Sequence, residues 1–308
     1  MSTYLITQAT GTQSGEVIKN LLAAGAKIHA VVRDPSKDLP AVLRDPAVTV
    51  FKGNSEDTDA VFAAAQGATG VFLNTFPIPG LELQQAQSVI AAAKKAGIKS
   101  IVASTSMGTS DKDLWDDDAT KAAGLHGYYA SKAAVEDAVW GAGFETTTVV
   151  RPGVIHIDYF GVHSEGNWPD LKTRGELDHD YEEGARMPQT VAGDIGRWAA
   201  AALLDPAKFN GAGIELTPEA LTMEEISAIV SRVAGREVPS RKRSAEERDA
   251  LRGKLFVQAF HFWLNGKDLS RLVKKAREAE AKYGIKFSSL EEGLTKDRDL
   301  LMATLPKV

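Results

Sequence analysis

The chain has 308 residues and a formal net charge of −5, because 41 acidic residues outnumber 36 lysines and arginines. Apolar residues make up 44% of it and cysteine is absent, which excludes a disulfide scaffold, a cysteine-ligated metal site and a catalytic thiol. The mild acidity argues against a nucleic-acid partner. No apolar run is long enough to cross a bilayer, and the first residues lack a signal-peptide pattern. We therefore expect a soluble cytoplasmic protein with no membrane partner.

Strands and helices alternate along the first half of the sequence. The residues predict a strand at Tyr4–Thr7, a turn at Gly11, a helix at Ser14–Ala24 and a strand at Ile28–Val32. A strand–helix–strand unit of this length predicts parallel pairing. The alternation continues with strands at Val48–Phe51, Gly70–Asn74, Ser100–Ala103 and Thr146–Arg151, and with helices at Asp57–Ala65, Glu82–Ala96 and Tyr128–Gly141. It predicts an α/β fold with a doubly wound, Rossmann-type parallel sheet.

The regular alternation ends after the sixth predicted strand. Ile155–Pro188 lacks clean periodicity, and we expect it to cover a site, with Tyr159 and Trp168 lining a pocket. Periodic segments return at Asp194–Leu204 (helix), Ile214–Leu216 (strand) and Met223–Ala234 (helix, with Thr222 as its N-cap). We expect residues 1–155 to form a dinucleotide-binding domain and residues 156–308 a smaller substrate lobe, interleaved with the last strands of the sheet.

The turn after the first strand is the first candidate site. In a doubly wound sheet, a dinucleotide lies beyond the carboxyl ends of the strands, with its pyrophosphate on the N-terminus of the first helix. Backbone N–H groups and the helix dipole favour negative charge there. The turn reads Thr7-Gln8-Ala9-Thr10-Gly11-Thr12-Gln13-Ser14-Gly15.

This segment resembles the glycine-rich TGxxGxxG turn of atypical short-chain dehydrogenases/reductases, in their NmrA-like branch. The resemblance implies that Thr10, Gly11, Thr12 and Gln13 contact the pyrophosphate of a bound dinucleotide. The first and third glycines of the motif are replaced, by Gln8 and Ser14. A strand–helix turn that binds no nucleotide is the alternative. The resemblance covers residues 3–235 and includes Val191–Gly196 and Ile214–Thr222, which are structural in that family.

Residues beyond the next strands suggest the cofactor's identity. Arg33 follows the second strand, where an arginine can bind the 2′-phosphate of NADP, whereas the adjacent Asp34 would favour NAD. We favour NADP(H), and an exposed arginine in a turn is the alternative. The resemblance implies an adenine contact at Asn54, in place of the family's aspartate. It also implies that the residues closing the fourth strand line the cofactor groove, and these are Asn74, Thr75 and Phe76.

Tyr128 and Lys132 form a Y-x-x-x-K motif at the start of a predicted helix. Residues four apart share one helix face, and an ammonium near a phenol lowers the phenol's pKa from about 10 toward neutrality. Such a tyrosine can exchange a proton with a carbonyl oxygen as hydride is transferred. The resemblance implies that Lys132 also holds the cofactor ribose and that Ser106, or else Ser104, polarises the substrate oxygen. The alternatives are a packing tyrosine and a solvated lysine.

Two charged clusters are interpreted as surface features. Asp116-Asp117-Asp118 lacks a nearby histidine at ligand spacing, so we expect a solvated acidic loop and no metal site. Ser240-Arg241-Lys242-Arg243 is a short basic run, for which we favour a charged surface loop over a nuclear signal or interaction patch.

Taken with the resemblance, these features predict an NADP(H)-dependent oxidoreductase acting on a small carbonyl, quinone or conjugated molecule, with Tyr128, Lys132 and Ser106 as its catalytic residues. Two other functions stay open. One is a redox sensor that binds NAD(P) without turnover and reports to a protein partner. The other is an isomerase or lyase on the same scaffold. The sequence is consistent with either a monomer or a homodimer, and it does not identify the substrate.

Overall fold

The computed structural model describes residues 2–307, which divide by their contacts into two compact units. Within these residues, the first comprises 2–110, 127–152 and 193–216, and the second comprises 111–126, 153–192 and 217–307. Both units are therefore discontinuous in sequence, because residues 193–216 return to the first unit. The expected split into domains at residue 155 remains a prediction.

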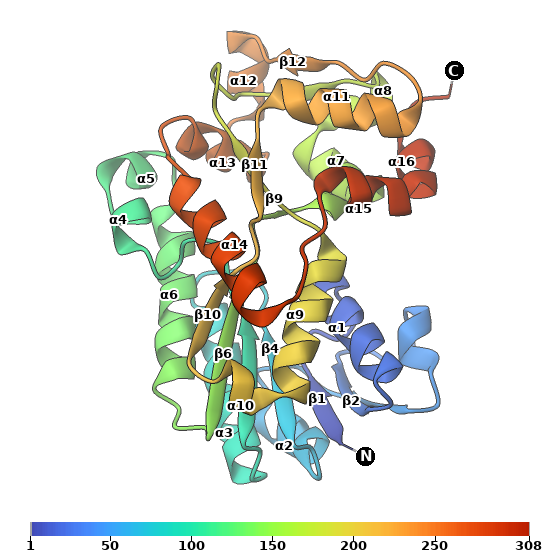
Figure 1. Cartoon of the computed structure of the whole chain (residues 1–308), viewed down its shortest axis with the longest axis vertical. Helices are drawn as coiled ribbons and strands as arrows, with labels where there is room; N and C mark the ends of the chain where they lie inside the picture. The colour runs from blue at the N-terminus through green and yellow to red at the C-terminus, as the bar shows by residue number, and fades with distance from the viewer. Residues whose placement is uncertain (1, 308) are drawn as a thin grey trace. The chain divides into compact units, whose positions relative to one another are not determined.

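The first unit is built on a seven-stranded sheet with the strand order β10-β6-β5-β4-β1-β2-β3 (Figure 1). All its strand pairs are parallel, and the order reverses between β1 and β4, as in a Rossmann fold. The predicted fold class is confirmed. Its elements are β1 (Thr3–Ile6), α1 (Thr12–Ala23), β2 (Lys27–Val32), the 3-10 helix η1 (Ala41–Arg44), β3 (Val48–Lys52), α2 (Thr58–Ala65), β4 (Gly70–Asn74), α3 (Leu81–Lys95), β5 (Ser100–Ser104), α6 (His126–Trp140), β6 (Thr146–Arg151), α9 (Ala192–Leu204), α10 (Pro206–Phe209) and β10 (Ala212–Glu215).

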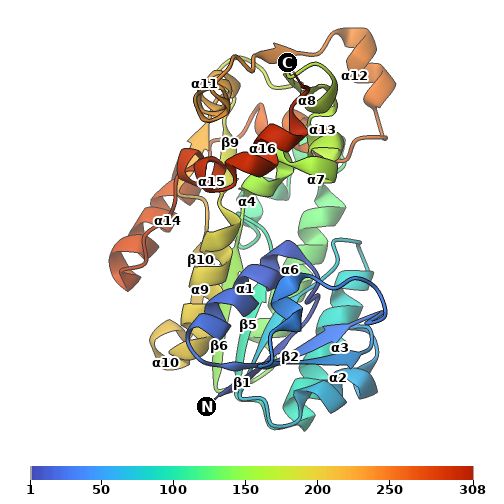
Figure 2. The ribbon, with the colours of Figure 1, turned by 90° about the vertical axis from the view of Figure 1, so that its right-hand side faces the viewer.

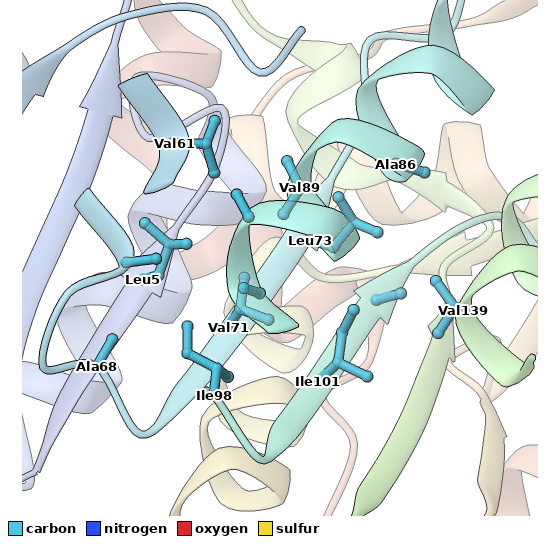
Figure 3. Close-up of a cluster of buried hydrophobic side chains, with 14 of the residues drawn as sticks. Leu5, Val61, Ala68, Val71, Leu73, Ala86, Val89, Ile98, Ile101 and Val139 are labelled. Carbon is cyan, nitrogen blue, oxygen red and sulfur yellow. The ribbon is translucent and has the colours of Figure 1, made fainter. Parts of the chain in front are cut away.

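Helices cover both faces of this sheet, which explains why its central strands are apolar on both sides. Helices α2, α3 and α6 pack on one face, over a cluster that includes Leu5, Val71 and Ile101 (Figure 3). Helices α1 and α9 lie on the other face (Figure 1), where Tyr4 donates a hydrogen bond to the carbonyl of Leu203. Because side chains alternate along a strand, Tyr4 and Leu5 point to opposite layers.

The second unit is mainly helical and contains two small sheets, of three and two strands. Helix α16 packs against both α7 and α15 in this unit (Figure 2). No helix among residues 2–307 is long and apolar enough to span a membrane. The elements are α4 (Lys112–Trp115), α5 (Asp118–Ala122), β7 (Val154–Ile155), the 3-10 helix η2 (His156–Tyr159), α7 (Gly161–Asn167), α8 (Pro169–Thr173), β8 (Leu177–His179), β9 (Met187–Thr190), β11 (Glu219–Leu221), α11 (Met223–Ala234), β12 (Ser240–Lys242), α12 (Ala245–Leu251), α13 (Val257–Leu264), α14 (Ser270–Tyr283), α15 (Leu290–Lys296) and α16 (Arg298–Thr304).

The basic run at residues 240–243 is not a surface loop, so that prediction was wrong. Its first three residues form β12, which pairs with β8 in parallel. The Arg243 side chain is buried and donates to Asp178 (2.7 Å) and Asp180 (2.8 Å), which are buried as well. Sequence composition missed this arrangement because the two aspartates lie more than sixty residues upstream.

Two further expectations for the second unit need correction. Asp117 is the N-cap of α5 and pairs with Lys267 at 2.5 Å, so the acidic run helps to build a helix start rather than only a solvated loop. Tyr159 and Trp168 stack with their ring centres 5.7 Å apart, and both are almost completely buried. They are core residues here, not the lining of an open pocket.

The close approach of α9 to α1 depends on Gly196. A Cβ there would lie 2.5 Å from the backbone oxygen of Glu16. We expect Gly196→Ala to lower the free energy of unfolding by about 1–3 kcal/mol, because the helices must move apart. Gly15→Ala is the control, since it lies inside α1 with open space around it and should raise stability by about 0.5–1 kcal/mol. Urea denaturation measures both, and equal effects would refute the close-approach account.

Arg243 and Lys242 provide a second matched pair. We expect Arg243→Ala to destabilise the protein by about 3–5 kcal/mol, because it leaves two buried carboxylates without their cation. Lys242 pairs with Glu182 on the surface, so Lys242→Ala should cost about 1 kcal/mol or less. Thermal unfolding of the two variants checks this, and a small effect at Arg243 would contradict the buried network.

Candidate functional site

The turn between β1 and α1 presents an open helix N-terminus. Gly11 is the N-cap of α1 with extended backbone angles (φ −80°, ψ 156°), and no side chain caps the helix. The first turn carries no acidic residue, and Thr10, Gly11 and Thr12 are exposed. The first N–H groups of the helix and its positive dipole end are thus available to an anion such as a pyrophosphate.

The turn keeps its tight shape although two glycines of the motif are replaced. Gln8 adopts φ +48°, a left-handed conformation that glycine enters freely and other residues enter at a cost of about 1–2 kcal/mol. Its carbonyl accepts the Gly11 N–H at 2.8 Å, so the tight turn persists. Ser14 is completely buried and donates to the carbonyl of Thr7 at 2.8 Å. Its hydroxyl therefore points away from the exposed face of the turn and joins helix to strand.

A cavity of about 460 Å³ adjoins this turn and is shared by the ends of β2, β3 and β4. Within it, the Arg33 Nε donates to the Asn54 Oδ1 at 3.0 Å. Four residues that were predicted to bind the cofactor line this cavity: Thr10, Arg33, Asn54 and Phe76. The sequence did not point to Gln85 or Ser55, which line it as well. The cavity is lined by Gln8, Thr10, Val31, Val32, Arg33, Asp34, Lys37, Asp38, Leu39, Pro40, Gly53, Asn54, Ser55, Glu56, Phe76 and Gln85.

Several charged residues that line this cavity come from the segment after β2, namely Arg33, Asp34 and Lys37. Asp34 accepts the side-chain hydroxyl of Ser36 at 2.6 Å and its backbone N–H at 3.1 Å. These hydrogen bonds lower the pKa of the Asp34 carboxyl. Arg33 and Lys37 remain exposed on the same cavity wall. The wall also carries the carboxylates of Asp38 and Glu56. Arg33 and Lys37 are the groups on it that could pair with a phosphate.

The end of β4 is joined to the end of β1 by Thr7. The Thr7 hydroxyl lies 3.0 Å from the carbonyl oxygen of Asn74 and 2.9 Å from its nitrogen. Thr75 is buried, whereas Phe76 is 49% exposed and lines the cavity. The Phe76 N–H is bound by the Gln85 side chain at 2.8 Å. Of the three predicted groove residues, only Phe76 lines this cavity, while Asn74 and Thr75 take part in fixing the strand end.

The end of β5 carries the serines considered for substrate binding. Ser104, the second choice, is buried and donates to the Oε1 of Gln13 at 2.7 Å. Gln13, which was predicted to contact the pyrophosphate, is therefore hydrogen-bonded to the end of β5. Ser106 is buried just beyond β5, and its backbone carbonyl accepts the Thr109 hydroxyl at 2.7 Å.

Tyr128 and Lys132 lie on one face of α6, as their spacing predicts. The Lys132 Nζ is 5.6 Å from the centre of the Tyr128 ring, which is half-buried. Tyr129 packs its ring edge-on against Tyr128 and is fully buried, which raises the pKa of its own hydroxyl. Between the two adjacent tyrosines, Tyr128 is therefore the one with solvent access for proton exchange.

Lys132 is not a solvated lysine. Its side chain is about 5% exposed, and its Nζ donates to the Oε1 of Glu82 at 2.5 Å. The same carboxylate accepts the hydroxyls of Ser131 (2.8 Å) and Thr75 (3.0 Å). Lys132 and the predicted groove residue Thr75 thus both donate hydrogen bonds to the fully buried Glu82.

Sequence reasoning missed Glu82. It is the second residue of α3 and looks like one of many acidic residues that favour the first turn of a helix. Only the packing of α3 against α6 brings it to Lys132, fifty residues later. Within residues 2–307, no group of three or more histidine, aspartate and glutamate side chains is arranged to hold a metal.

Known proteins resemble this chain in sequence and in fold. An NAD(P)H azoreductase from Xenophilus azovorans is 28% identical over 234 residues, which cover 76% of this chain and 74% of the azoreductase. A crystal structure of NmrA, a negative transcriptional regulator in complex with NAD, superposes with a TM-score of 0.74 at 22% identity, covering 99% of this chain and 98% of that one.

A second solved structure has the same fold. An Escherichia coli NADPH-dependent quinone oxidoreductase bound to NADPH gives a TM-score of 0.73 at 21% identity, covering 96% of this chain and 99% of that one. The shared fold is a dinucleotide-binding one. A model of the NmrA-like family matches residues 1–250. The predicted resemblance is confirmed, and the chain belongs to the NmrA-like family of NAD(P)-binding proteins.

Proposed function

We propose that this protein is an NADP(H)-dependent reductase that transfers hydride to a quinone or another small conjugated or carbonyl compound. The observation that carries the proposal is the uncapped N-terminus of α1, whose preceding turn adjoins a cavity that has Arg33 and Lys37 in its lining. That arrangement has an anion site at one end and cationic groups at the other, as the pyrophosphate and 2′-phosphate of NADP require.

The residues present fit such a cofactor. The exposed turn at Thr10, Gly11 and Thr12 would hold the pyrophosphate, and Arg33 with Asn54 would hold the 2′-phosphate end. Lys132 has three N–H donors, of which Glu82 takes one, so the others can bind ribose hydroxyls. When bound, the reduced nicotinamide supplies a hydride.

The substrate class rests on relatives and on the residues near Lys132. The azoreductase and the quinone oxidoreductase are both named for reducing conjugated compounds with NAD(P)H or NADPH. In this chain, Tyr128 would donate a proton to the substrate and Ser106 would polarise its oxygen. The partial exposure of Tyr128 and the position of the Lys132 Nζ over its ring support the first role.

A redox sensor is the second candidate, and one observation favours it. The Lys132 ammonium is already neutralised by the buried Glu82 carboxylate, so it assists proton transfer by Tyr128 less than a free ammonium would. NmrA, which shares the fold, is a transcriptional regulator solved with NAD and with NADP.

Turnover separates the two candidates. We expect the purified protein to oxidise NADPH steadily when menadione is supplied, because a bound reduced nicotinamide beside a quinone transfers hydride. Loss of NADPH absorbance measures this, and a titration of intrinsic fluorescence measures NADPH binding in parallel. Tight NADPH binding with no oxidation by menadione, by aromatic aldehydes or by an aromatic azo compound would contradict the reductase and favour the sensor.

Arg33 should decide between the two cofactors. We expect Arg33→Ala to weaken NADPH binding roughly tenfold to a hundredfold, as loss of a charge-assisted contact to the 2′-phosphate implies. NADH lacks that phosphate, so its affinity should change far less. Lys27→Ala is the control, because Lys27 lies at the opposite end of the same strand. If Arg33→Ala weakened both cofactors equally, Arg33 would not be the 2′-phosphate ligand.

A further inference from the structure

Glu82 stands out as a buried charge that the proposed reaction does not use. It lies at the start of α3, and its side chain has no exposed surface. Its carboxylate accepts three hydrogen bonds, from Thr75, Ser131 and Lys132. Burying a carboxylate is costly unless it is paired and hydrogen-bonded, and here both conditions are met, so the carboxylate and the ammonium hold each other in place.

The position of this carboxylate changes what Lys132 can do for Tyr128. The ammonium nitrogen is 2.5 Å from Glu82 Oε1 but 5.6 Å from the centre of the Tyr128 ring. Because the ammonium is paired with a carboxylate, its field at Tyr128 is that of an ion pair, which is weaker than the field of an isolated cation. A carboxylate bound to Lys132 therefore weakens the acid assistance that the lysine gives to the phenol.

Acceptors differ in how much they need that assistance. Hydride added to a simple aldehyde carbon gives an alkoxide, a strong base that needs a proton from a positioned acid as it forms. Hydride added to a quinone reduces it to a hydroquinone monoanion, in which the negative charge is shared with the aromatic ring. This weaker base can take its proton from Tyr128 without help from a cation, or from water, while the dihydronicotinamide that lost the hydride is oxidised.

We infer that Glu82 determines substrate specificity: by neutralising Lys132 it withholds acid assistance from Tyr128 and restricts the protein to quinone-type acceptors over simple aldehydes. The inference rests on the proposed reductase function. Glu82 acts through Lys132 and Tyr128, so it is a positioning residue and not a catalytic one.

The test compares wild-type protein with Glu82→Gln, which keeps the hydrogen-bonding shape and removes the charge. NADPH oxidation is measured with menadione and with benzaldehyde, and kcat/KM is obtained for each. We expect the benzaldehyde-to-menadione ratio of kcat/KM to rise about tenfold or more in the variant, within the range that general acid catalysis supplies. An unchanged or lower ratio would overturn the inference.

Two further variants separate charge from structure. Ser131→Ala removes one hydrogen bond to Glu82 without altering the ion pair, so its ratio should stay near the wild-type value. An equal rise in Ser131→Ala would mean that loosening, and not charge, changes the specificity, which would overturn the inference. Adding Tyr128→Phe to Glu82→Gln should abolish the gain, and a gain that persisted would show that Tyr128 is not the acid concerned.

Wild-type protein provides an independent test if Glu82→Gln fails to fold. We expect wild type to prefer menadione over benzaldehyde by about a hundredfold or more, and comparable rates with both would overturn the inference while leaving the reductase function intact. A wild type that binds NADPH but reduces neither compound would instead refute the reductase function, and the inference with it.

Discussion

The hydroxyl of Thr7 joins β1 to β4 at the place where the strand order of the sheet reverses. It contacts the backbone of Phe72 and Asn74 on the neighbouring strand, while the Thr7 carbonyl accepts the buried hydroxyl of Ser14 from α1. These bonds fix where β1 ends and how α1 begins. The open helix N-terminus at Gly11 depends on both, because an anion can approach its N–H groups only if strand and helix hold the turn in that shape.

Buried ion pairs hold together strands, helices and loops of the first unit that lie far apart in the sequence. Arg151 binds Glu136 through two nitrogens, at 2.8 and 2.7 Å, and Glu215 accepts the N–H of Gly108 in the loop after β5. Lys132 and Glu82 act likewise between α6 and α3. Each pair is costly to break from one side, since the remaining charge would be buried alone. Around Lys132 the charges are therefore paired, whereas Arg33 and Lys37 remain exposed on the cavity wall.

Much of this arrangement followed from patterns in the sequence. The strands Gly70–Asn74 and Thr146–Arg151 and the helix Met223–Ala234 were predicted with their observed bounds, because apolar periodicity and capping residues act locally. The helix containing Tyr128 begins two residues earlier than predicted, since helix starts depend on capping contacts as well as periodicity. The turn after β1 was predicted to bind the cofactor on the basis of Gly11, although two glycines of the motif are missing, and that role stays a prediction.

The sequence by itself determined the alternation of strands and helices in the first unit, the family, and the shared helix face of Tyr128 and Lys132, because these depend on residues close together in the chain. It left residues 155–188 without regular elements, where the structure has several short ones. Only the tertiary structure decided that Lys132 is buried and paired with a carboxylate. Its partner Glu82 lies fifty residues away on another helix, and no periodicity links the two. The same holds for Arg243, whose carboxylates come from a distant strand region. Whether a charged side chain is exposed or buried depends on the partners that folding places beside it. Local sequence composition does not contain that information.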